Sequence, residues 1–163
     1  MATLILDERR IKLIIQRIVV SVKEFFPADG IPVFAGIQPQ GLKLAHLTSE
    51  YYFNKFGIHV PVISIHINKS DPSQNIVLEG ELIDLTNKNI LLLDDVLNSG
   101  RTMAYALSFL LHHKPASVKT GVLVDRDHKI YPVAADFYGI RLATSLENHV
   151  RVHLDNYWGA WLE

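Results

Sequence analysis

Apolar residues recur at helical spacing in three stretches of the chain. In the first stretch they step by four and three, at Ile11, Ile15, Ile18, Val22 and Phe25. Asp7 precedes this stretch with a side-chain oxygen suited to cap a helix, and Pro27 follows it, so we expect a helix between them. Residues 40–57 (QGLKLAHLTSEYYFNKFG) and 100–113 (GRTMAYALSFLLHH) predict two more helices.

Short runs of aliphatic and β-branched residues alternate with these helices. The clearest are PVFAGI, VPVISIHI, NILLLDD and SVKTGVLVD, and IVLEGELID and VRVHLD give weaker strand signals. The unbroken apolar run at residues 90–93 is typical of a central parallel strand that is covered on both faces. The alternation predicts one α/β domain over residues 1–163, with a mainly parallel sheet flanked by helices. Ligands of such sheets bind at the carboxyl ends of the strands.

The composition narrows the class of protein. The 163 residues are 48% hydrophobic, with 16 basic and 17 acidic side chains and a net charge of −1, which argues against a globally basic nucleic-acid binder. The absence of cysteine excludes disulfides, a zinc knuckle and a thiol nucleophile. No apolar run approaches the roughly 18 residues of a membrane span, and charges come too early for a secretory signal. We therefore expect a soluble, cytoplasmic protein with no membrane partner.

The stretch ILLLDDVLNSGRT, residues 90–102, holds the most specific chemistry. Asp94 and Asp95, called the acid pair below, end the buried run. The phosphate loop follows directly, with Leu97, Asn98, Ser99, Gly100, Arg101 and Thr102. A loop that opens a helix presents free backbone N–H groups to an anion, and carboxylates accept hydrogen bonds from sugar hydroxyls or hold Mg²⁺. The combination predicts a ribose 5-phosphate site, whereas nucleotide P-loop spacing and a strong dinucleotide-binding fingerprint are missing.

These residues resemble the phosphoribosyl pyrophosphate motif of type I phosphoribosyltransferases. LILDERRIK, GIQPQGLKLA, VLVDRDHKIYPVAADFYG and ATS are similar, in that order, to the branch that combines uracil phosphoribosyltransferase activity with attenuation of pyrimidine operons. The likeness runs from about residue 4 to residue 154, and the final NYWGAWLE does not match well. It implies a small hood contributed by flanking segments, and a homodimer or larger oligomer that serves pyrimidine salvage. The implied reaction transfers ribose 5-phosphate from phosphoribosyl pyrophosphate to a nucleobase, uracil first. Mg²⁺ would lie on the pyrophosphate rather than on direct protein ligands.

The resemblance also implies roles for individual residues. The acid pair would hold the ribose hydroxyls, the phosphate loop would hold the 5-phosphate, and Lys69, beside Asn68 on a mobile loop, would join the acid pair in catalysis. The pyrophosphate loop would span residues 36–41 and include Gln38, Pro39, Gln40 and Gly41. The base site would involve Asp125, Arg126, His128, Lys129, Phe137 and Tyr138.

Two departures from the family pattern affect these expectations. The pyrophosphate loop commonly contains a cation in the family, whereas Gln38 and Gln40 are neutral and bind a polyanion more weakly. We predict a cis bond at Gln38–Pro39; the alternative is that Pro39 only shapes the start of the next helix. Asn98 stands where the purine-salvage branch tends to have an acid. Because asparagine cannot act as a general base, it argues against hypoxanthine and guanine.

Two alternatives to a catalytic role stay open on the sequence. An RNA-binding attenuator would need basic side chains along the first helix and beside the base site, where Arg17 and His128 are suitably placed. Phe25, Ala134 and Ile140, however, are neutral where that branch has charge. A non-catalytic nucleotide sensor would keep the ribose-phosphate site and lose the pyrophosphate loop. The sequence fixes neither the base nor the oligomeric state.

Overall fold

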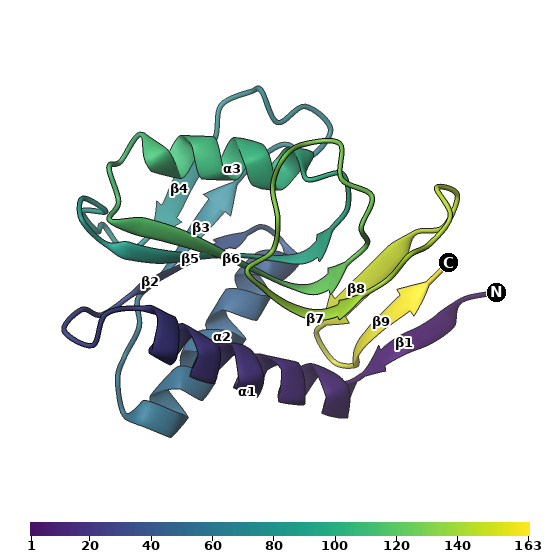
Figure 1. Ribbon diagram of the computed structural model, residues 1–163, viewed down its shortest axis with the longest axis horizontal. Coiled ribbons are helices and arrows are strands. Elements are labelled where there is room, and N and C mark those ends of the chain that lie inside the picture. Colours follow the sequence, from purple (N-terminus) through teal and green to yellow (C-terminus); the bar gives the residue numbers. More distant parts are fainter.

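A six-stranded sheet forms the centre of the computed structural model, which describes all residues 1–163 (Figure 1). The strand order is β4-β3-β2-β5-β6-β7, with β4 antiparallel and every other pairing parallel. The strands are β2 (Val33–Ile37), β3 (Val62–His66), β4 (Val77–Gly80), β5 (Asn89–Leu97), β6 (Ser117–Asp125) and β7 (Phe137–Arg141). The predicted α/β class and mainly parallel sheet are confirmed.

Three helices cover the two faces of this sheet. They are α1 (Glu8–Phe25), α2 (Gln40–Phe56) and α3 (Arg101–Leu111). The first two lie on one face and α3 lies on the other (Figure 1). Asp7 caps α1 as predicted, because its Oδ1 accepts a hydrogen bond from the Arg10 N–H at 2.8 Å.

Strand β5 lies between the two cores. Leu91 and Leu93 belong to a cluster of 21 buried residues on the side of α1 and α2, whereas Ile90 and Leu92 belong to a cluster of 15 on the side of α3. Burial on both faces explains the unbroken apolar run, since neither face meets water. The two aspartates that follow are buried and half-buried, and Leu97 at the end of the strand packs again in the core on the side of α3.

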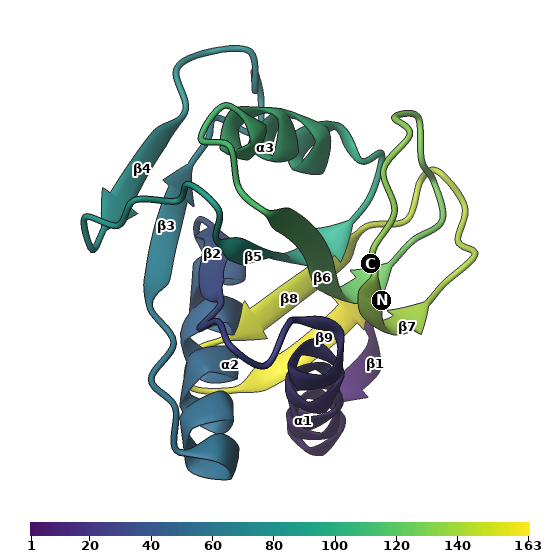
Figure 2. The same ribbon diagram turned by 60° about the vertical axis from the view of Figure 1, so that its left-hand side comes forward.

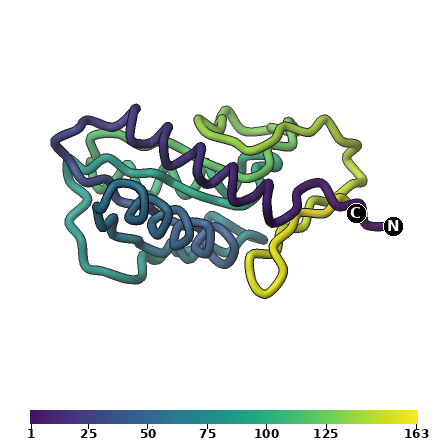
Figure 3. Tube along the Cα trace, turned by 90° about the horizontal axis from the view of Figure 1, so that it is seen from below, coloured from purple at the N-terminus to yellow at the C-terminus, as the bar shows by residue number.

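A second, three-stranded antiparallel sheet joins the two ends of the chain. Its order is β1 (Thr3–Asp7), β9 (Trp158–Leu162) and β8 (Val150–Leu154), and Figure 3 shows both termini at this end of the molecule. The hood expected from flanking segments corresponds to this sheet. The hydrophobic pattern did not predict β1 and β9, which pair with each other although they lie at opposite ends of the sequence.

The parallel strands of the central sheet end at one edge, beside the N-terminus of α3. In Figure 2 the sheet is seen from a second side, with β8 crossing near this edge. The edge formed by the ends of β2, β3, β5 and β6 is therefore where the fold positions a ligand. Separately, no helix of the chain is long and apolar enough to cross a membrane.

Candidate active site

Three segments far apart in the sequence converge on Asp94. This carboxylate ends the apolar run of β5 and is 4% exposed, and Asp95 beside it is half-buried. The Lys69 Nζ lies 3.3 Å from Asp94 Oδ1. Gly41, at the start of α2, is so close that a Cβ added to it would lie 3.1 Å from the same oxygen. The structure thus brings the acid pair, the mobile-loop lysine and the pyrophosphate loop together.

The phosphate loop turns directly into α3. Gly100 has a φ of +83°, a left-handed conformation that glycine adopts without steric cost, and it ends the loop where α3 begins at Arg101. The Ser99 carbonyl accepts hydrogen bonds from the Ile130 and Tyr131 N–H groups at 2.8 and 3.1 Å. These contacts hold the loop at the N-terminus of α3, where the Arg101 N–H donates to Ser99 Oγ at 3.3 Å and the next N–H groups lack an acceptor within the helix.

A polar hollow of about 240 Å³ contains these groups. Lining residues come from the mobile loop, β5, the phosphate loop, α3 and β8: Lys69, Asp94, Asp95, Val96, Leu97, Asn98, Ser99, Gly100, Arg101, Thr102, Met103 and Val150. The acid pair and every phosphate-loop residue singled out from the sequence are present. The Leu97 side chain is 2% exposed and packs in the core under α3, so only its backbone faces this site.

Burial raises the pKa of the Asp94 carboxyl well above its ordinary value of 3.8, and the neighbouring Asp95 carboxylate raises it further. The Lys69 ammonium group opposes this shift. A carboxyl group in this position accepts a hydrogen bond or a cation readily, because each of these relieves an unfavourable buried charge.

The raised pKa predicts how stability depends on pH. Between the ordinary value near 3.8 and the higher folded pKa, the folded chain holds a proton on Asp94 that the unfolded chain has lost. The contribution of Asp94 to the free energy of unfolding therefore falls as pH rises through this interval, by about 1.4 kcal/mol per pH unit. Urea unfolding of the wild type and Asp94→Asn at a series of pH values should show the variant gaining relative stability with pH, then levelling off. Parallel curves would contradict the assignment.

The pyrophosphate loop has a cis bond at Gln38–Pro39, as predicted from its sequence. Residues of β3 and β4 hold the Gln38 side chain. Its Nε2 donates to Ser64 Oγ at 2.5 Å and to Glu79 Oε2 at 3.3 Å. Its Oε1 lies 3.0 Å from His66 Nδ1. The neutral amide thus has a carboxylate as a neighbour. No lysine or arginine belongs to the loop itself, so the missing charge noted in the sequence is not supplied within it.

Asp125 and Arg126 lie at the carboxyl end of β6, next to the end of β5. Asp125 is fully buried and pairs with Lys129 Nζ at 3.3 Å and Arg141 Nη2 at 3.2 Å. Arg126 is 5% exposed; its Nη1 donates to Asn98 Oδ1 at 3.0 Å. Asp125 therefore serves as a buried anchor, whereas Arg126 reaches the hollow through Asn98.

Phe137 and Tyr138 lie away from this hollow. They begin β7, which runs parallel to β6, so they stand at the opposite end of the strand from the ligand edge. Phe137 packs edge-to-face against Phe25 at the end of α1, with ring centroids 5.6 Å apart. The aromatic residues that the sequence suggested for the base site are thus placed in the core and beside α1.

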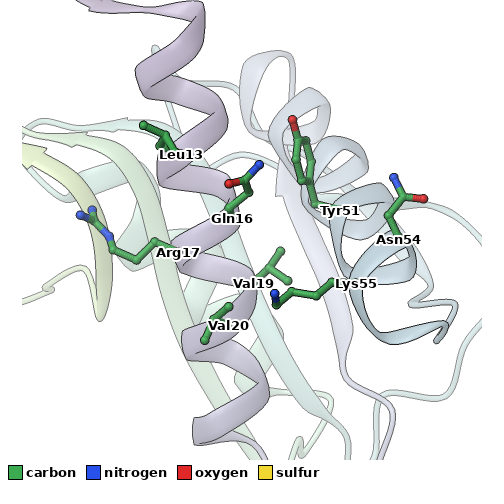
Figure 4. A pocket seen from close by; sticks show the side chains of 8 residues that line it. All are labelled: Leu13, Gln16, Arg17, Val19, Val20, Tyr51, Asn54 and Lys55. Carbon is green, nitrogen blue, oxygen red and sulfur yellow. The ribbon is translucent and has the colours of Figure 1, made fainter.

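A second, larger hollow of about 660 Å³ lies between α1 and α2 (Figure 4). It is lined by Leu13, Gln16, Arg17, Val19, Val20, Tyr51, Asn54 and Lys55. None of these residues is acidic, and no helix begins there, so this hollow offers neither half of a ribose-phosphate site.

Val96, Val150 and Thr144 were not identified from the sequence. Val96 and Val150 give the hollow its apolar wall, and Thr144 accepts hydrogen bonds from Arg126. Val150 looks like any apolar strand residue, and only the packing of the terminal sheet brings it to β5. The segment ATS, which contains Thr144, was the one signal available for this region.

Comparisons of this sequence with a family model and with known proteins agree on one family. The family described as phosphoribosyl transferase domain matches residues 2–156. Bifunctional protein PyrR 1 of Lactiplantibacillus plantarum is 32% identical, over 98% of this chain and 94% of its own length. Bifunctional protein PyrR of Streptococcus pneumoniae is 31% identical, over 92% of this chain and 88% of its own length.

Solved structures agree on the fold. The hypoxanthine phosphoribosyltransferase of Trypanosoma cruzi aligns with a TM-score of 0.78 at 15% identity, covering 98% of this chain and 95% of that one. A hypoxanthine phosphoribosyltransferase from Staphylococcus aureus aligns with a TM-score of 0.73 at 16% identity, covering 88% and 79%. At these identities the likeness concerns the fold and not the choice of base.

Proposed function

This chain belongs to the type I phosphoribosyltransferase family, and on that premise we propose that it transfers ribose 5-phosphate from phosphoribosyl pyrophosphate to uracil. The observation that supports this most is the acid pair beside the N-terminus of α3 in one polar hollow. A phosphate on the helix N-terminus and hydroxyls on the acid pair correspond to the two ends of a ribose 5-phosphate.

In the proposed reaction, the bond between C1 of the ribose and pyrophosphate breaks while a bond to a base nitrogen forms, and the N–H proton of the base passes to the departing pyrophosphate or to solvent. The developing oxocarbenium ion is positive, and the Asp94 and Asp95 carboxylates lie where they would balance this charge. The phosphate loop holds the other end of the sugar, so that the protein acts mainly by orienting the two reactants. Lys69 contacts Asp94 at 3.3 Å from its own loop, and its ammonium group would balance the negative charge of the departing pyrophosphate.

The acid pair also fits a magnesium ion that arrives with the substrate. No group of three or more histidine and acidic side chains gathers to hold a metal. Asp94 and Asp95 would contact an Mg²⁺ ion on the substrate pyrophosphate through water rather than as direct ligands. Bound there, Mg²⁺ would neutralise charge on the departing pyrophosphate.

The choice of uracil is supported by the resemblance of the sequence to the uracil phosphoribosyltransferase branch and by Asn98. Pyrophosphate release from the Mg²⁺ complex of phosphoribosyl pyrophosphate, measured against uracil, cytosine, hypoxanthine and guanine, tests it. Release with uracil is expected. Release only with hypoxanthine or guanine would overturn the argument from Asn98, and no release with any base, with tight nucleotide binding, would favour a sensor.

RNA binding is a second candidate function, supported by the relatives' description as bifunctional. The two basic residues best placed for it are already engaged: Arg17 Nη2 donates to the Tyr138 and Gly139 carbonyls at 2.7 and 3.0 Å, and His128 contacts the Thr144 carbonyl. In Figure 4 Arg17 points away from the hollow between the helices, toward the strands. Salt-dependent binding to a structured leader RNA would establish this function.

The neutral pyrophosphate loop predicts weak binding of the substrate, which added charge should improve. Gln38→Lys combined with Glu79→Gln places an ammonium group in the loop and removes the carboxylate 3.3 Å from Gln38. We expect the KM for phosphoribosyl pyrophosphate to fall about tenfold, equivalent to about 1.4 kcal/mol. Glu79→Gln alone and Gln16→Lys, on α1, are the controls. An unchanged KM in the double variant would mean that the leaving group binds elsewhere.

A further inference from the structure

The orientation of the Asn98 amide is fixed by its neighbour. Arg126 Nη1 lies 3.0 Å from Asn98 Oδ1. A guanidinium group has only N–H donors and accepts no hydrogen bond, so the atom of Asn98 that faces it must be the oxygen. The Asn98 Nδ2 group therefore points away from Arg126. The oxygen of an amide accepts hydrogen bonds and its nitrogen donates them, so the contact with Arg126 determines which of the two atoms faces it.

Arg126 itself has little freedom to move. Its side chain is buried, with 5% exposure, and its Nε and Nη2 groups are also hydrogen-bonded. Nε and Nη2 donate to Thr144 Oγ1 at 3.2 and 2.9 Å, and Nη2 also donates to the Ser145 carbonyl at 3.2 Å. Flipping the Asn98 amide would place its NH₂ group against Arg126 Nη1, which would leave the Nη1 N–H that faces Asn98 without an acceptor.

The other end of the Asn98 amide has no hydrogen-bond acceptor within the chain. The residue is exposed and lines the hollow. Val96 and Val150 line the same hollow. Among the phosphate-loop side chains, only that of Asn98 hydrogen-bonds to Arg126, the residue that follows β6.

We propose that Arg126 positions Asn98 as a hydrogen-bond donor that selects a nucleobase with a ring carbonyl over one with an amino group at that place. This inference rests on the proposed function for the location of the base, and it adds the chemistry by which the base is chosen. An amino group would meet the Asn98 NH₂ group donor to donor. The pair thus recognises an oxo-base by its acceptor and rejects an amino-base by the unmatched donors.

Equilibrium binding of the two pyrimidine nucleotides tests this without requiring turnover. Uridine 5′-monophosphate and cytidine 5′-monophosphate have the same ribose phosphate and differ in the oxo or amino group of the ring. Their Kd values are measured by calorimetry on the wild type, Asn98→Asp, Asn98→Leu, Arg126→Met and Arg126→Lys. The wild type should prefer the uridine nucleotide by roughly ten- to a hundredfold.

The variants distinguish recognition of the base from a structural role in the phosphate loop. Asn98→Leu should bring the two Kd values within about threefold of one another, and Asn98→Asp should favour the cytidine nucleotide because it presents an acceptor. Arg126→Met should lose the preference although Asn98 is intact, and Arg126→Lys, which retains a donor, should restore part of it. A merely structural Arg126 would weaken both nucleotides equally.

The outcomes bear separately on the two proposals. An unchanged preference in Asn98→Leu and Asn98→Asp, or equal wild-type affinities, would overturn the role of Asn98, whatever the turnover. The expected preference together with no pyrophosphate release from phosphoribosyl pyrophosphate and uracil would leave Asn98 as a reader of the base and defeat the proposed transfer reaction instead.

Discussion

Replacing both members of the acid pair, Asp94→Asn with Asp95→Asn, should lower kcat/KM for nucleotide formation by roughly 10²–10⁴-fold. Two carboxylates that accept hydrogen bonds from ribose hydroxyls contribute about 1.5–3 kcal/mol each, and an amide of the same shape accepts more weakly. The amides also provide no negative charge opposite the oxocarbenium ion. Initial rates with phosphoribosyl pyrophosphate and uracil measure the loss.

The same double variant should fold at least as well as the wild type. The buried Asp94 carboxylate is unfavourable when charged, as its raised pKa indicates, and asparagine removes that charge without changing the volume. Asp29→Asn with Glu24→Gln is a matched control, since both residues are exposed and the change of net charge is the same. Activity that survives in the Asp94 and Asp95 variant would defeat the ribose assignment; activity lost in the control would indicate a general charge effect.

Gly41→Ala should destabilise the protein by about 1–3 kcal/mol and remove most of the activity. An added Cβ would lie 2.5 Å from the Leu93 carbonyl oxygen and 2.9 Å from Asp94 Cα, both of which are backbone atoms that cannot rotate away. The start of α2 would have to move off β5, and it would displace the pyrophosphate loop from the acid pair.

Gly30→Ala is the control for this substitution. The nearest atom to a Cβ at that position is Asn89 Nδ2 at 3.8 Å, an ordinary contact, so stability should change little. Thermal unfolding and initial rates of both variants distinguish close approach at Gly41 from a general cost of replacing glycine. Equal melting temperatures and rates for the two variants would contradict the close approach.

Much of the fold was predictable because its central elements are locally consistent. The helical stripe from Ile11 to Phe25 and the apolar run at residues 90–93 each fit only one kind of environment. The terminal sheet was not predictable in the same way. Strands β1 and β9 depend on pairing between residues such as Thr3 and Leu162, and no local pattern records a partner so distant in the sequence.

The site was also predictable only in part. The acid pair and the phosphate loop are adjacent in the sequence, so their chemistry could be recognised as a unit. Phe137 was expected near the base because the family resemblance placed it near the segment that covers the base, yet the parallel direction of β7 places it at the far end of the strand. The contact between Asn98 and Arg126 joins two strand ends and became visible only in three dimensions.

Whether the acid pair serves transfer of ribose 5-phosphate to uracil is decided by the uridine 5′-monophosphate that the wild type and the Asp94→Asn, Asp95→Asn variant form from phosphoribosyl pyrophosphate and uracil with Mg²⁺. We expect the wild type to form one nucleotide for each pyrophosphate released, and the variant to be slower by roughly 10²–10⁴-fold. Equal rates of nucleotide formation by the two proteins would contradict this role, as would a wild type that forms no nucleotide.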